Sequence, residues 1–91
     1  MNAQIQYEIA EALEEKGDIR KAVEEYLKVP RLYSKGRFWS LRAELRCAQL
    51  FERLEEPAEA KKLYQKLAEM DVEESVLAKK RLEWINWRGR K

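Results

Sequence analysis

The sequence predicts an all-α protein, an α-solenoid of two helical hairpins and a closing helix. Apolar residues recur at helical spacing along almost the whole chain, and no segment shows the alternation with a period of two that marks a strand. The stretch EEKGDIRKAVEEYLKVP, residues 14–30, recurs in looser form as LEEPAEAKKLYQKLAEM, residues 54–70. Both stretches place an alanine and a tyrosine at the same distance from a turn, so the chain repeats one helical hairpin.

Two apolar stripes separated by a turn predict the first hairpin. Gly17 breaks the chain, and Asp18 is a natural N-cap for the second helix because its carboxylate can accept backbone N–H groups. Pro30 lacks an N–H donor and should kink or stop that helix near Val29. The two stripes are Ile5, Ile9, Ala12 and Leu13, and then Ile19, Ala22, Val23, Tyr26 and Leu27.

A third helix, from about residue 38 to residue 55, is expected to lie between neighbours because it is apolar on two sides. Pro57 suits the first turn of a fourth helix, and Asp71 with Glu74 predicts a capping box before a fifth. The two sides of the third helix are Phe38, Leu41, Leu45 and Ala48, and Cys47, Leu50, Phe51 and Leu54. The inner faces of the last two helices are Ala60, Leu63, Tyr64 and Leu67, and Ala78, Leu82 and Ile85.

Composition and charge restrict the class of protein. Charged side chains make up 40% and hydrophobic ones 45% of the 91 residues, which fits one soluble helical domain. The net charge of +2 gives no strong overall attraction to nucleic acid or anionic lipid. Cys47 is the single cysteine, and its place on an apolar helix face favours the core over a reactive thiolate.

The compartment stays open between the cytoplasm and the cell envelope. No apolar run approaches the ~18 residues of a membrane span. The first residues, MNAQIQYEIAEALEE, lack the basic and apolar regions of a signal peptide, so we expect no signal peptide within this chain.

Aligning Ala22 with Ala60 also superimposes Tyr26 on Tyr64, at an offset of 38 residues. Small alanines let the two helices of a hairpin approach closely, and the aromatic ring fills the space beside them. This pattern resembles the tetratricopeptide repeat, a helix–turn–helix unit of about 34 residues. Further residues that match are Ala10 and Ala48 of the inner helices and Gly17–Asp18 at the first turn.

The resemblance implies a single domain over 1–91. Its parts would be a first repeat over 3–34, a second over 37–71 and a capping helix over 72–88. Stability usually takes about three repeats, so we expect a fragment of a longer protein or part of an oligomer. The second turn has Glu55 where glycine is usual. The long repeat resembles those of bacterial cell-envelope proteins, such as the Tol-Pal coordinators and outer-membrane assembly lipoproteins.

The resemblance implies a non-enzymatic module that binds another protein in the groove lined by the inner helices. The sequence has no histidine, no metal-ligand cluster and no Gly-rich phosphate loop, so no catalytic residue, metal site or cofactor is expected. Two polar stripes lie at equivalent positions of the inner helices. One consists of Arg42, Arg46, Gln49 and Arg53, and the other of Gln4, Glu8, Glu11 and Glu15.

These stripes allow two interpretations. The neighbouring helices can pair the charges across the repeat boundary, each exposed pair contributing about 0–1 kcal/mol. Alternatively, the arginines hold an acidic segment of a partner, because a guanidinium can grip a carboxylate with two hydrogen bonds.

The last helix carries tryptophans outside its inner face. Trp84 borders the core and is expected to cap the end of the solenoid. Trp87 is harder to bury, and exposed aromatic residues often mark an interface. Its partner would be a second copy of the chain, a further repeat or another protein.

Three functions are therefore considered. The first is a protein–protein interaction or scaffolding module that binds a partner polypeptide through the groove or the solenoid end. The alternative is a segment that self-associates or docks onto further repeats of its own chain. The third is a basic adaptor that binds nucleic acid or a membrane surface. We expect neither nucleic acid nor a membrane as the partner. The sequence does not identify the partner or the full-length architecture.

Overall fold

The chain folds into a row of helices that pack in sequence order. This computed structural model describes residues 1–33, 35–70 and 72–89, which form five helices and no strand. They are α1 (Ala3–Lys16), α2 (Ile19–Leu32), α3 (Arg37–Arg53), α4 (Pro57–Ala68) and α5 (Glu74–Gly89). The all-α solenoid is confirmed, with two helical hairpins followed by a fifth helix.

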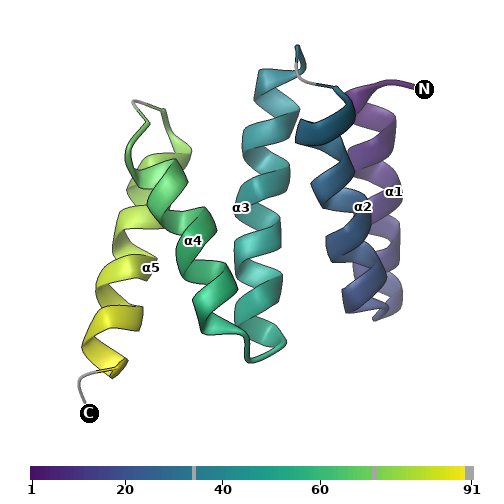
Figure 1. Cartoon of the computed structure of the whole chain (residues 1–91). Helices are drawn as coiled ribbons and strands as arrows, with labels where there is room; N and C mark the ends of the chain where they lie inside the picture. The colour runs from purple at the N-terminus through teal and green to yellow at the C-terminus, as the bar shows by residue number, and fades with distance from the viewer. Residues whose placement is uncertain (34, 71, 90–91) are drawn as a thin grey trace.

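The helices form two layers. Each helix packs against the next, and in addition α1 contacts α3 and α3 contacts α5. Helices α1, α3 and α5 therefore form one layer, and α2 and α4 lie against it. The molecule measures 44 × 30 × 16 Å, and the N- and C-termini lie at opposite ends of the row (Figure 1). None of the described helices is both long enough and apolar enough to cross a bilayer.

Helix α3 lies between two apolar clusters, which confirms the prediction made from its two apolar sides. Its residues Ala43, Cys47 and Leu50 are buried in a cluster with α1 and α2. On its other side, Leu41 and Ala48 are buried in a cluster with α4 and α5. The partly buried ring of Phe51 packs against both clusters, whereas Phe38 at the start of the helix is exposed. The alanines and tyrosines that define the repeat, Ala10, Ala22, Tyr26, Ala48, Ala60 and Tyr64, are all fully buried.

The two hairpin turns have the same backbone geometry. Gly17 has φ 94° and Glu55, at the equivalent position, has φ 59°, so both occupy the left-handed region. The N–H groups of these two residues donate to the carbonyls of Glu14 and Glu52, each at 3.0 Å. The N–H of the next residue donates to a carbonyl five positions back, at 2.9 Å in the first turn and 2.8 Å in the second. This pattern is the Schellman motif that ends many helices, and the second turn forms it without a glycine.

Two expectations about helix ends need correction. Helix α2 does not stop near Val29 but continues through Pro30 to Leu32, because the N–H groups after the proline still find carbonyls, as in the 3.0 Å bond from Tyr33 to Val29. A kink at Pro30 stays a prediction. Asp18 does precede α2, but its side chain makes no capping bond, and its carboxylate lies 3.9 Å from Lys21. The predicted capping box depends on Asp71, which lies outside the described residues.

Three of the four residues predicted for the inner face of α1 lie outside the core, whereas the fourth, Leu13, packs against the cluster formed with α2 and α3. Ile5 is 45% exposed and Ile9 37%, and Ala12 is also exposed. Helix α1 turns a different face toward α2 and α3, because small and amphipathic side chains fit the close approach of the hairpin helices better than isoleucine does. The residues buried there are Ala3, Gln6, Tyr7 and Ala10.

Candidate functional site

Two tyrosine–glutamate–arginine groups connect successive helices. In the first triad, Tyr26 of α2 donates to Glu14 of α1 at 2.9 Å, and Arg46 of α3 binds the same carboxylate. In the second triad, Tyr64 of α4 donates to Glu52 of α3 at 2.5 Å, and Arg81 of α5 binds that carboxylate, with its Nε at 3.1 Å. Each triad therefore joins three consecutive helices through one carboxylate.

The triad carboxylates stay ionised although they are largely buried. Burial opposes ionisation of Glu14, but the hydrogen bonds from Arg46 and Tyr26 outweigh it and hold the pKa below its usual value. In the second triad, burial likewise opposes ionisation of Glu52, and its bonds from Arg81 and Tyr64 lower the pKa. A triad is therefore a satisfied ion pair within the protein, and its arginine is committed to that glutamate.

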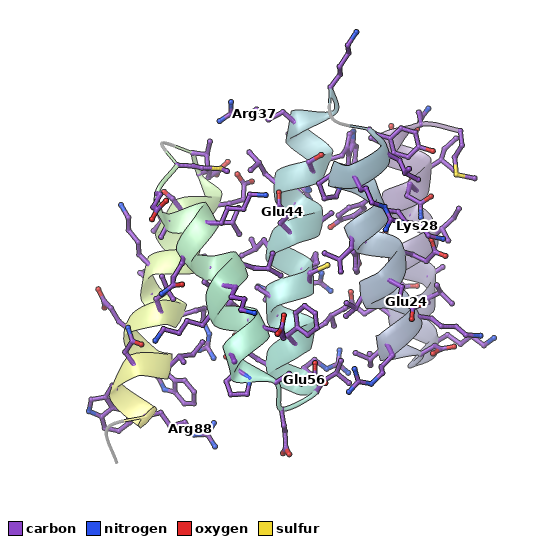
Figure 2. The ribbon with its side chains drawn as sticks, viewed as in Figure 1. Glu24, Lys28, Arg37, Glu44, Glu56 and Arg88 are labelled. Atoms are coloured by element: carbon purple, nitrogen blue, oxygen red, sulfur yellow. The ribbon has the colours of Figure 1, made fainter. Side chains whose placement is uncertain are left out.

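Each hairpin has a further polar contact between its two helices, and the two contacts lie at equivalent positions. Gln6 of α1 donates to the Glu25 carboxylate at 2.6 Å, and Lys28 approaches the same group at 3.0 Å. In the second hairpin, Glu44 of α3 lies 2.7 Å from Lys66 of α4. Figure 2 labels Glu44 on α3 and Lys28 on α2. These contacts satisfy polar groups inside the hairpins rather than forming an open site.

The predicted arginine stripe lies along the exposed side of α3, and its members have different surroundings. Arg46 belongs to the first triad and also approaches Gln49 at 3.4 Å. Arg42 lies over the rings of Phe38 and Trp39, at 5.1 and 5.8 Å from their centroids. Arg53 is mostly exposed and reaches Glu14 only at 3.9 Å.

The predicted acidic stripe does not meet these arginines. Glu8, Glu11 and Glu15 are exposed on α1 and form no ion pair with any residue that the structure describes. The carboxylate that binds Arg46 is Glu14, which lies outside the predicted stripe. That either stripe binds a partner stays a prediction.

A pocket brings together two residues that the sequence placed in separate candidate sites. It lies where the end of α3 and the turn after it face the last two turns of α5, and its volume is about 700 Å³. Arg53 from the arginine stripe and Trp84 from the fifth helix both line it. Trp87, which is 53% exposed, does not. The full lining is Glu52, Arg53, Glu55, Pro57, Trp84, Ile85, Arg88 and Gly89.

Arginines surround the tryptophan of this pocket. The guanidinium carbon of Arg81 lies 4.8 Å from the centroid of the Trp84 ring, and that of Arg88 lies 5.1 Å from it. Such cation–π contacts favour one position of the indole ring and hold the two guanidinium groups beside it. Arg81 is already bound to Glu52, whereas Arg53 has only its 3.9 Å contact with Glu14 and Arg88 only its contact with the ring, so these two are the arginines of the pocket that can turn to a ligand. Figure 2 shows Arg88 at the same end of the molecule as Glu56 and the α3–α4 turn.

A second pocket of about 400 Å³ adjoins the first, with which it shares Pro57, Ile85 and Gly89. Lys61 of α4 and Asn86 of α5 also line it. The two pockets together are lined by apolar side chains such as Trp84 and Ile85 and by cationic, acidic and amide groups.

The sequence analysis missed the triads, although a signal was present. Glu14 and Glu52 are 38 residues apart, as Tyr26 and Tyr64 are, so the repeat alignment pairs the glutamates too. The arginines were harder to find, because Arg46 and Arg81 are separated by 35 residues. That difference arises because the connection between α4 and α5 is not equivalent to the one between α2 and α3.

Other chemistry has little support among the described residues. They contain no group of three or more His, Cys, Asp or Glu side chains placed to hold a metal ion. Cys47 is fully buried, and its thiol donates a weak bond to the carbonyl of Val23 at 3.7 Å. Burial, with the nearby Glu44 carboxylate, raises the pKa of this thiol, so it is held in the unreactive neutral form.

Comparison with known families places the chain beside an established family. The family described as "Soluble NSF attachment protein, SNAP" matches residues 1–83. The match supports the helical repeat prediction, but it does not support the bacterial cell-envelope type. No curated protein sequence and no solved structure matches the chain significantly.

Proposed function

Since the chain belongs to the soluble NSF attachment protein (SNAP) family, we propose that it is a non-enzymatic adaptor that binds an acidic segment of a partner protein. The family consists of helical adaptors that bind proteins, which supports a protein-binding role in general. The binding surface we propose is the pocket formed by α3, the α3–α4 turn and α5.

The observation that carries this proposal is the grouping of Arg53, Trp84 and Arg88 around one pocket. A carboxylate that enters beside Trp84 would meet two guanidinium groups not committed to a triad, and a charge-assisted hydrogen bond to an arginine is roughly twice as strong as a neutral one. The ring of Trp84 and the side chain of Ile85 would cover the apolar part of the same segment.

The charges of the pocket favour a short acidic peptide over a long polyanion. Glu52 and Glu55 also line it, so a ligand with a continuous row of phosphates would meet repulsion there. Nucleic acid binding draws its affinity from many phosphate contacts at once. A single carboxylate needs only the two arginines, so the neighbouring glutamates oppose it less than they oppose a row of phosphates.

Selection of peptides from a random library on the immobilised chain tests the proposal. We expect the selected peptides to be enriched in Asp and Glu beside an apolar residue. Fluorescence anisotropy of a labelled peptide should then show at least tenfold weaker binding to Arg53→Glu/Arg88→Glu, with the helix content by circular dichroism unchanged.

The matched control is Arg31→Glu/Arg37→Glu, which makes the same change in net charge. Both residues are exposed, and Arg37 lies at the opposite end of the molecule from Arg88 (Figure 2). The control should bind the peptide nearly as tightly as the unchanged chain. Equal loss in both variants would mean that only net charge matters, and retained binding by Arg53→Glu/Arg88→Glu would rule out this pocket.

A further inference from the structure

One edge of the molecule is basic although the chain as a whole is nearly neutral. The chain has 17 acidic residues, yet none of them lies within residues 26–43, and the first charged side chain of α1 is Glu8. The net charge of +2 averages over this basic segment and the acidic ones, so it conceals a local attraction for anions. The basic residues of the segment are Lys28, Arg31, Lys35, Arg37 and Arg42.

The fold brings this segment together with the start of α1. Ala3 of α1 and Val29 of α2 are buried in one cluster, against which Tyr33 and Trp39 pack. A Cβ at Gly36 would lie 2.8 Å from the Cβ of Ala3, so the α2–α3 connection touches the first turn of α1. Figure 1 shows this connection and the N-terminus at the same edge of the row. A further helix added to the row would pack beside α1 or α5 and would leave the connection open.

Three of the cations at this edge are not engaged by a carboxylate. Arg31, Lys35 and Arg37 are exposed and form no ion pair with any residue that the structure describes. They lie at the end of α2, in the connection and at the start of α3. Lys28, by contrast, is paired with Glu25 at 3.0 Å. The edge therefore offers three neighbouring positive charges to an anionic ligand.

An exposed aromatic ring lies among these cations. Phe38, in the first turn of α3, is 59% exposed, and its ring packs edge to face on that of Trp39, with the centroids 5.1 Å apart. The Trp39 ring in turn lies 5.3 Å from that of the buried Tyr7, so Phe38 rests on a fixed support. The guanidinium carbon of Arg42 lies 5.1 Å from the Phe38 centroid. A ring held in this way beside a guanidinium is the kind of surface on which nucleic-acid bases stack.

The charges along the rest of this edge favour a narrow ligand. The connection between α4 and α5 lies at the same edge (Figure 1), and there Glu69 and Glu73 are exposed. A flat anionic surface such as a bilayer would face these carboxylates as well as the cations. A single strand can follow the α2–α3 half alone, where its phosphates meet only positive charge.

We infer that this edge is a second binding surface, which takes a short single strand of RNA or DNA. Phosphates of the strand contact Arg31, Lys35 and Arg37, and one base stacks on Phe38. Because every base has a flat face and every nucleotide a phosphate, binding shows little sequence preference. The surface is separate from the pocket beside Trp84, so the chain can hold an acidic protein segment and a strand at the same time.

Fluorescence anisotropy with two labelled probes, oligothymidine and oligouridine of about 12 nucleotides, tests the inference. Both probes should bind at about 50 mM salt with dissociation constants on the order of 1–100 µM. Contacts to three phosphates predict a slope of about −2 when the logarithm of the binding constant is plotted against the logarithm of the salt concentration.

Charge reversal at the edge should remove this binding. Arg31→Glu/Arg37→Glu should bind the probes at least tenfold more weakly and show a shallower salt slope. The matched control is Arg53→Glu/Arg88→Glu, which makes the same change in net charge, with Arg88 at the opposite end of the molecule from Arg37 (Figure 2). At about 150 mM salt the Debye length is ~8 Å, so the control should bind nearly as tightly as the unchanged chain. Circular dichroism checks that both variants keep their helix content.

Replacement of Phe38 separates base stacking from other apolar contact. Phe38→Leu keeps an exposed apolar side chain but removes the flat ring, so binding should weaken about fivefold or more. The salt slope should stay the same, because no phosphate contact is lost. Phe38→Trp restores a flat ring and should bind as tightly as the unchanged chain.

Three results would overturn the inference. The first is the absence of binding of either probe up to about 1 mM protein at low salt. The second is an equal loss of binding in the two charge-reversal variants, which would mean that only net charge matters. The third is binding to phosphatidylserine vesicles or to a polyglutamate peptide that is tighter than binding to both probes and is unchanged in Phe38→Leu. That result would assign the edge to a membrane or to an acidic polypeptide.

Discussion

Glu14 and Glu52 show how the protein tolerates carboxylates at its interior edge. An unpaired buried charge costs several kcal/mol, whereas one that accepts from a tyrosine hydroxyl and a guanidinium is satisfied. Tyr26 and Tyr64 each place a ring in the core and a hydroxyl on the glutamate. The same tyrosine is therefore a packing residue at one end and a hydrogen-bond donor at the other.

Acid should destabilise the fold through these carboxylates. The folded-state pKa of Glu14 and of Glu52 is lowered from 4.5, so the unfolded chain binds more protons in the range between the two pKa values. Their stabilisation is fully present above the unfolded pKa and is lost as the pH falls through the folded pKa. We expect a melting temperature that is level at neutral pH and drops below about pH 4.5.

The variant Glu14→Gln/Glu52→Gln provides the check. It should be less stable than the unchanged chain at pH 7, by about 1–3 kcal/mol per site, because each change leaves an arginine without its carboxylate. Its melting temperature should fall less steeply between pH 5 and pH 3. Parallel melting curves for the two proteins over that range would exclude the triads as the acid-sensitive groups.

The left-handed residues at the two turns give opposite predictions. A side chain in this conformation costs about 1–2 kcal/mol, and glycine avoids the cost. Glu55→Gly should therefore stabilise the protein by about 1 kcal/mol, and Gly17→Ala should destabilise it by a similar amount. Space is not limiting at Gly17, since an added Cβ would meet no atom within 4 Å. Denaturant unfolding measures both changes, and a stabilising Gly17→Ala would contradict the conformational argument.

Helix α3 depends on its neighbours on both sides, and replacement of Leu50 and of Leu45 should therefore have different effects. Leu50 is 1% exposed and fully inside the α1–α2 cluster, so Leu50→Ala should cost about 2–5 kcal/mol. Leu45 packs against the other cluster but is only partly buried, so Leu45→Ala should cost less. Thermal denaturation compares the two variants. Equal melting temperatures would contradict the prediction that the loss of stability follows the buried fraction of each leucine.

Helix α5 packs into the core on one side and lines the pocket on another. Ala78 is fully buried, and Leu82 and Ile85 pack beside it, as their spacing predicts. Trp84 instead lies between two arginines at the pocket. Sequence periodicity identifies the first side, because only apolar residues fit a core. It cannot identify the second, because stacking of an arginine on a ring depends on the rotamers of both.

For the molecule as a whole, the helix order, the hairpin repeat and the two-sided burial of α3 could be predicted, since all follow from local apolar spacing. The buried face of α1 could not. Ile5 and Ile9 form a stronger apolar stripe than Ala3, Gln6 and Tyr7, yet the fit between helices selects the weaker one. The pocket was equally hidden, because it joins Arg53 and Trp84 across the α3–α4 turn, and that juxtaposition needs the packing angle of α5.

The shared carboxylates also determine how the protein comes apart. A row of repeats can fray from its ends when each unit is stable alone, because its free energy divides into intrinsic and nearest-neighbour terms. Here, the departure of α5 would leave Glu52 without Arg81, and the departure of α1 would leave Arg46 without Glu14. The departure of either end helix therefore breaks an ion pair as well as apolar contacts. Unfolding should therefore be a cooperative, all-or-none event rather than stepwise unzipping.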